Sequence, residues 1–154
     1  MAEPIPTTTE PGVEPWRDAF RRGVAPALGR RRLEALARAL ESDDPRLCQE
    51  VTVVPSPASI RAGGSAEPDL SVAPLSACAV GLAAWDADRL ATVGDVTDAF
   101  EAVAAVTERL TGDRSALSHF LRFWDETPRR ELFPLVLAEA RLWLSSLPAE
   151  GGAA

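Results

Sequence analysis

The sequence predicts an all-α protein, a bundle of about five to six helices with one short extended segment and one long loop. Apolar residues recur at the spacing of a helix through most of the 154 residues. Only residues 50–55, EVTVVP, have the β-branched run of a strand. The longest predicted helices all follow residue 75 and are joined by short turns suited to antiparallel packing. A chain of this length can fold as a single domain with its own core.

The predicted domain plan has three parts. Residues 1–14 are rich in proline and threonine and form a disordered tail, residues 15–148 form a single helical domain, and residues 149–154 form a frayed end. Within the domain, residues 15–54 hold the N-terminal helices and the extended segment, 55–74 a loop, and 75–148 the helical core. A loop as long as 55–74 inside a compact domain is usually functional or mobile.

Two helices open the domain. Pro15 suits the first position of a helix, which Gly23 and Pro26 should interrupt. The segment GRRRLEALARALES at 29–42 has leucines every three or four residues and predicts an amphipathic helix. The extended segment that follows has no strand partner that the sequence reveals, so we expect it to be isolated.

The helical core is expected to begin at Ser76, which can cap its first helix, and Asp95 and Asp113 are the expected caps of the next two. The stretch WDETPRR then predicts a helix–helix corner. A residue before proline is pushed out of the helical conformation, so Thr127 should end one helix and, with Pro128, begin the last. The side chains expected in the core are Trp85, Phe100, Phe120, Trp124 and Trp143, with Val96, Val103 and Leu110 on the stripe of Phe100.

Arginine content and charge have separate explanations. All sixteen basic residues are arginine, and the absent residues (lysine, asparagine and tyrosine) have AT-rich codons. This pattern indicates a bacterium with a GC-rich genome, so the arginines alone do not indicate phosphate recognition. The net charge of −7 is uneven: residues 16–40 carry seven arginines against two acids, and residues 67–108 carry eight acids against Arg89. Such asymmetry can steer partners or hold two segments together, but we expect two solvated helix faces of opposite sign.

The corner stretch supplies the candidate site residues. His119 is the one histidine of the chain and the candidate general base. Asp125, Glu126 and Arg129 are the polar groups beside it. On its helix His119 lies off the apolar stripe, where a histidine is more often a packing or surface residue, so we expect packing rather than catalysis.

We expect no metal and no cofactor. Cys48 and Cys78 lack the closely paired spacing of a zinc site and are expected to be free thiols. The glycine pair at 63–64 lacks the spacing of a phosphate-binding loop, and the chain has no lysine to complete one.

The function predicted from the sequence is a non-catalytic helical protein-interaction module, with self-association as one form of that interaction. The last helix supports it, because apolar residues lie on nearly all of its sides; Phe133, Leu137, Leu144 and Leu147 lie off its main stripe. The alternative is a small-ligand-binding protein or an enzyme with a pocket at the corner near His119. The expected partner is a protein or a second copy, and a small-molecule ligand stays open. Acidity argues against nucleic acid, and the lack of a long apolar run argues against a membrane and for the cytoplasm.

Overall fold

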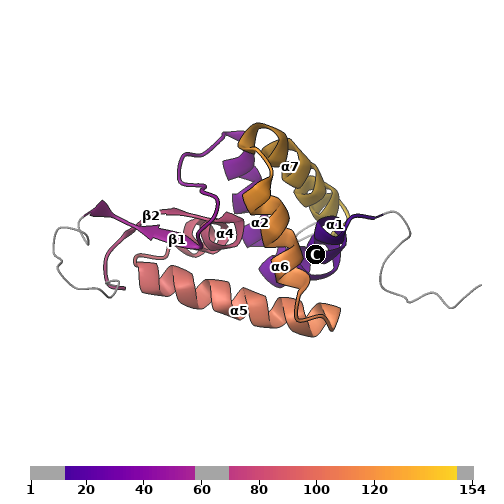
Figure 1. Ribbon diagram of the computed structural model, residues 1–154, viewed down its shortest axis with the longest axis horizontal. Helices are drawn as coiled ribbons and strands as arrows, with labels where there is room; N and C mark the ends of the chain where they lie inside the picture. The colour runs from indigo at the N-terminus through magenta and orange to yellow at the C-terminus, as the bar shows by residue number, and fades with distance from the viewer. Residues whose placement is uncertain (1–12, 58–69, 149–154) are drawn as a thin grey trace, which may run out of the picture.

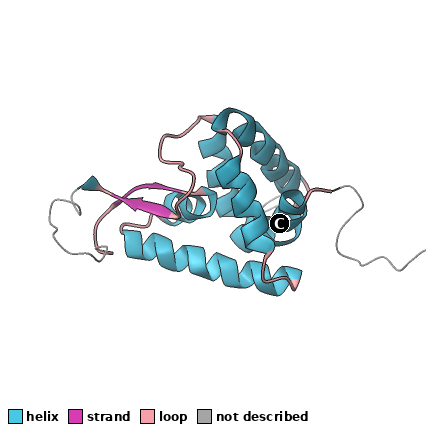
Figure 2. Cartoon of the chain, in the orientation of Figure 1, coloured by secondary structure: helices cyan, strands magenta, loops and turns pink. Residues whose placement is uncertain are grey.

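The computed structural model describes residues 13–57 and 70–148 (Figure 1). The expectations for the tail over 1–12, for loop residues 58–69 and for the end over 149–154 lie outside the described residues. In chain order the elements are α1 (Pro15–Ala19), the π-helix η1 (Phe20–Val24), α2 (Ala25–Glu41), β1 (Val53–Pro55), β2 (Pro74–Ala77), α4 (Ala79–Asp88), α5 (Val93–Thr111), α6 (Ala116–Glu126) and α7 (Arg129–Ser145). If the run from α1 to α2 is counted as one bent helix, the described residues form five helices and one two-stranded sheet (Figure 2). The all-α prediction is confirmed.

The helices are arranged around α2 and α4. Helix α2 packs against both α4 and α7, and α5 lies along one side of the molecule against α4 and η1 (Figure 1). Helix α6 packs against α1. The β1–β2 sheet projects at the end of the molecule opposite α1. The contact between α2 and α4 brings the C-terminal end of α4 beside Arg31 and Arg32 of α2.

The N-terminal helical run differs from its prediction. It continues through Gly23 and Pro26, because the backbone widens to a π-helix over 20–24 instead of ending. The interruption occurs at Gly29, which has a φ of 82° and a ψ of 175°. Only glycine adopts such a φ without steric cost, so the bend of α2 is located there.

The extended segment is not isolated, which corrects a second prediction. Strand β1 pairs antiparallel with β2, with Val53 opposite Ala77 and Val54 opposite Ser76. Ser76 is therefore a strand residue, and α4 begins after Cys78. A parallel bridge from Leu47 extends the pairing at Ala77. The pairing joins segments about twenty residues apart, so local sequence patterns did not reveal it.

Helix boundaries follow the predicted order with shifts of a few residues. Thr92, not Asp95, caps α5, and its hydroxyl accepts the backbone N–H of Asp95 at 3.1 Å. Helix α6 begins after Ser115. Thr127 ends α6 in an extended conformation, as predicted, while α7 begins at Arg129, one residue later than expected.

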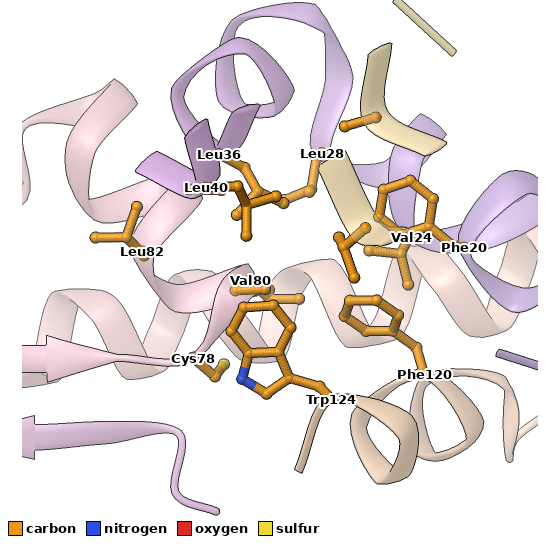
Figure 3. Packing of buried hydrophobic residues seen from close by; sticks show 14 of the residues in the cluster. Phe20, Val24, Leu28, Leu36, Leu40, Cys78, Val80, Leu82, Phe120 and Trp124 are labelled. Atoms are coloured by element: carbon orange, nitrogen blue, oxygen red, sulfur yellow. The ribbon is translucent and has the colours of Figure 1, made fainter. Parts of the chain in front are cut away.

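The hydrophobic core contains two of the five predicted aromatic anchors in fully buried positions. Figure 3 shows Phe120 and Trp124 side by side in the core, with ring centroids 6.2 Å apart. Trp85, Phe100 and Trp143 are only partly buried against this cluster. Two aromatic residues of the N-terminal helical run, Trp16 and Phe20, are buried instead; they contact the rings of Phe123 and Phe120, respectively.

The stripe of α5 also differs from its prediction. Leu110 is exposed and Thr107 is fully buried. The cause is the close approach of η1 at Gly23, where a Cβ atom would lie 2.7 Å from the methyl carbon of Thr107. A small side chain at one position and none at the other let the two helices meet.

Part of the apolar surface of α7 is used inside the domain. Phe133, which the sequence placed off the main stripe, is buried and stacks on Trp124 with ring centroids 5.6 Å apart. Leu137 and Leu144 are partly buried against the core. Leu135 and Leu142, one heptad apart, remain on the surface, 39% and 57% exposed.

Candidate anion-binding pocket

The corner between α6 and α7 binds the segment that follows α2, residues 43–50. The indole N–H of Trp124 donates to the carbonyl of Cys48 at 2.8 Å. The side-chain amide of Gln49 donates to the carbonyls of Trp124 and Thr127, both at 2.7 Å. These are carbonyls that the C-terminal end of a helix leaves without intrahelical partners. Trp124, the most buried residue of the corner, therefore has a structural role in holding this segment.

Arg129 and Asp125, two of the predicted site residues, hold the same segment. The Arg129 guanidinium donates to the Asp43 carboxylate at 2.8 Å and to the carbonyls of Leu47 and Asp44 at 2.7 and 2.8 Å. The Asp125 carboxylate accepts a backbone N–H from the same segment at 2.7 Å. Both side chains therefore act as ties between the corner and the segment after α2.

The other two predicted site residues lie apart from these ties. His119 is exposed and lines a hollow of about 150 Å³ with Asp18, Arg22 and Asp113. Glu126 is exposed and makes no side-chain hydrogen bond or ion pair with any residue in the described ranges. None of the other three predicted site residues lines the hollow at His119.

A different hollow, of about 570 Å³, lies between α2, the segment after it and the C-terminal end of α4. Four arginines, one aspartate, a tryptophan and a leucine form most of its lining. We refer to it as the arginine pocket, and it is lined by Arg31, Arg38, Arg46, Trp85, Asp86, Ala87, Arg89 and Leu90.

Three segments position these side chains. Arg31 and Arg38 are seven residues apart, on one face of α2 beyond the bend at Gly29. Arg46 lies in the segment that the corner holds, and its guanidinium lies over the Trp85 ring, 5.1 Å from the centroid. Arg89 follows the last residue of α4. The pocket thus depends on the packing of α2 against α4.

Asp88 joins the two helices beside the pocket. Its carboxylate accepts hydrogen bonds from Arg31 and Arg32, each at 2.7 Å. Burial raises the pKa of Asp88, but the hydrogen bonds from Arg32 and Arg31 outweigh it and hold the pKa below its ordinary value. The carboxylate is therefore ionised at neutral pH and committed to these two arginines.

Two further acids, Asp44 and Asp86, bind Arg46. Its guanidinium donates to Asp44 at 2.8 Å and to Asp86 at 3.0 Å. The hydrogen bond from Arg46 holds the pKa of Asp44 below its usual range. The guanidinium of Arg46 therefore lines the pocket with two carboxylates already bound to it.

Arg38 and Arg89 are much less committed. The nearest approach of Arg38 to an acid is 3.8 Å, to Asp86, and its side chain is 68% exposed. Arg89 is exposed and makes no side-chain hydrogen bond or ion pair with any residue that the structure describes. Each guanidinium has five N–H donors in a planar fork. The pocket therefore presents donors in excess of the carboxylates that it contains.

The ion pairs of Asp88 correct the interpretation of the charge asymmetry. Arg31 and Arg32 in the basic segment bind Asp88 in the acidic segment, so the two segments are held together instead of forming separate solvated faces. Sequence reasoning missed the pocket, because it attributed the arginine content to codon composition and so had no reason to single out four arginines from sixteen. The seven-residue spacing of Arg31 and Arg38 was the available signal.

Other chemistry finds little support in the described ranges. No group of three or more histidine, cysteine, aspartate or glutamate residues there is placed to hold a metal ion. Both cysteines are free thiols, and burial raises the pKa of Cys78 to about 11. A thiol with such a pKa is a poor nucleophile at neutral pH.

None of the helices in the described part of the chain is long and apolar enough to cross a bilayer.

Comparison with known proteins adds no functional assignment. No protein-family model, curated protein or solved structure matches this chain.

Proposed function

We propose that this protein is a non-catalytic interaction module that binds an acidic segment of a partner protein in the arginine pocket. The observation that carries the proposal is the presence of Arg38 and Arg89 at one hollow with guanidinium donors to spare. Arginine forks match the geometry of carboxylate and phosphate oxygens. An anionic group placed between the two arginines would satisfy donors that no acid of the described chain satisfies.

The lining supports binding without catalysis. It contains no histidine, cysteine, serine or threonine, so it offers neither a nucleophile nor a base that titrates near neutral pH. Its one carboxylate, Asp86, is bound to Arg46. Arginine stays protonated throughout the physiological range, so the remaining polar groups bind and orient anions but do not transfer protons.

The charge of the whole chain limits the kind of anion. With a net charge of −7, the protein repels extended polyanions, and only a local positive site attracts a negative group. A short acidic segment can place one or two groups in the pocket while the rest of the partner stays at a distance. Complementary charge of this kind contributes to both association rate and specificity.

Calorimetric titration with a short peptide of alternating aspartate and glutamate tests the proposal. We expect saturable binding that weakens with added salt, because the interacting charges are partly exposed. Replacing Arg38 with alanine, or Arg89 with glycine, should weaken binding about tenfold each, the equivalent of about 1.4 kcal/mol for a charge-assisted contact. Arg122→Ala, at an exposed position of α6, is the matched control and should bind as the parent does. Equal losses in all three variants would contradict a specific site.

A second copy of the chain is the partner favoured by α7. Leu135 and Leu142 present two large apolar side chains on one exposed face. Light scattering at high micromolar concentration should give a mass above that of one chain, and the double change Leu135→Ser and Leu142→Ser should return it to the monomer. A monomer for the parent protein under these conditions would remove self-association from the proposal.

A further inference from the structure

We propose that the arginine pocket selects a phosphate monoester group over a carboxylate, and that Asp86 produces this selectivity as an internal competitor. The inference rests on the proposed function and specifies the chemistry of its ligand. Three observations support it: the position of Asp86, the few bonds made by Arg38 and Arg89, and the backbone conformation of Arg89.

Asp86 occupies the place of a carboxylate ligand within the pocket. It accepts a hydrogen bond from Arg46 at 3.0 Å and lies 3.8 Å from Arg38. An incoming carboxylate carries the same charge and the same two oxygens as Asp86. The aspartate is already attached to the protein, so it holds Arg46 without the entropy loss of association. A carboxylate therefore gains less from entering than a ligand with more charge and more oxygens does.

A phosphate monoester offers more than Asp86 can. It carries about −1.5 to −2 charges at pH 7 and three strong acceptor oxygens. Those oxygens can accept from Arg38 and Arg89 together, and Arg46 can turn donors toward the ligand while it keeps Asp44 at 2.8 Å. The Arg46 guanidinium lies over the face of the Trp85 ring, and this contact limits the movement of Arg46. The arginine donors of the pocket can therefore bind the additional charge and the third oxygen of the phosphate.

The backbone of Arg89 is a further observation. It has a φ of 55° and a ψ of 48°, the left-handed conformation that ends α4. Glycine is the usual residue at such a helix end, because the backbone of a residue with a Cβ atom is strained in this conformation. Residues held in such backbone conformations cluster at functional sites. An arginine in a glycine-type position at the pocket indicates a role for its side chain in binding.

The test uses the full chain and two peptides of identical sequence, one with phosphoserine and one with glutamate at the central position. We expect the phosphoserine peptide to bind at least about tenfold more tightly, because its larger charge and its third oxygen strengthen the charge-assisted contacts to the arginines. Asp86→Asn should reduce the ratio of the two affinities, because it increases the affinity for the glutamate peptide. Arg89→Gly should weaken both peptides while the thermal midpoint stays equal or rises, because the backbone strain is relieved. A lower thermal midpoint together with weaker binding would indicate that Arg89 acts through folding and would overturn its assigned role.

The remaining outcomes separate this inference from the proposed function. Equal affinity for the two peptides, or an unchanged ratio in Asp86→Asn, overturns the phosphate selectivity and leaves the acidic-segment proposal standing. Absence of binding by both peptides overturns both. Free O-phosphoserine binding as tightly as the phosphoserine peptide supports a phosphate site and identifies a small molecule as its source. Tighter binding of a short DNA duplex, with a steep dependence on salt, would identify backbone contacts to nucleic acid and overturn the inference.

Discussion

Replacing Trp124 with alanine should lower the free energy of unfolding by about 3–5 kcal/mol, the usual loss when a large aromatic side chain is removed from a core. The side chain is fully buried and contacts the rings of Phe120 and Phe133. Its indole N–H also satisfies the Cys48 carbonyl, so the alanine variant loses a hydrogen bond as well as packing. Urea unfolding followed by circular dichroism measures the change.

Two further variants make this result specific. Trp124→Phe keeps a ring and removes the hydrogen bond, so it should fall between the parent and the alanine variant. His119→Ala, at an exposed position of the same helix, should change stability by no more than about 0.5 kcal/mol. Comparable losses for His119→Ala and Trp124→Ala would show that our assignment of the two sides of α6 is wrong.

Replacing Glu139 with alanine is expected to cost about 3 kcal/mol of stability, at the lower end for breaking a buried ion pair. This carboxylate is 4% exposed and accepts hydrogen bonds from Arg17 at 2.5 Å and from Arg21 at 2.7 and 3.0 Å. It joins α7 to the N-terminal helical run. The low end applies because both arginines are partly exposed and can regain water. Glu131→Ala, at an exposed position of the same helix, is the control and should be nearly neutral.

The effect at Glu139 should depend on pH. Burial raises the pKa of this carboxyl, but the hydrogen bonds from Arg21 and Arg17 outweigh it, and the pKa in the folded protein lies below its ordinary value. A group with a lowered folded pKa contributes stability above its unfolded pKa, about 4.3, and loses that contribution as the pH falls through the folded pKa. Unfolding measured from pH 7 downward should therefore show the parent and Glu139→Ala converging in acid. A difference that stays constant would contradict the ion-pair explanation.

The fold could be predicted where the signal was local. Leucine spacing after Gly29 predicted the amphipathic part of α2, and the rule for residues before proline predicted the end of α6 at Thr127. The π-helix and the pairing of β1 with β2 could not be predicted in this way. The first is a local widening that accompanies the approach of α5 at Gly23, and the second joins non-local segments.

The candidate site was harder to predict than the fold. Sequence reasoning concentrated on His119 because histidine titrates near neutral pH, but this residue lies apart from Asp125 and Arg129. The arginine pocket is assembled from α2, the segment after it and the end of α4, and no single stretch of sequence contains it. The seven-residue spacing of Arg31 and Arg38 was the one sequence signal of the pocket, and only spatial convergence adds Arg46 and Arg89.

The segment after α2 connects the corner and the pocket in a way that concerns ligand affinity. Leu47 and its neighbours are held by Arg129 on one side and by the bridge to Ala77 on the other. Arg46, in the same segment, reaches the pocket. If the segment detaches by local unfolding, the pocket loses one wall although α2 and α4 stay folded. The measured affinity is then the intrinsic affinity multiplied by the fraction of molecules with the segment docked, and the distant α6–α7 corner sets that fraction.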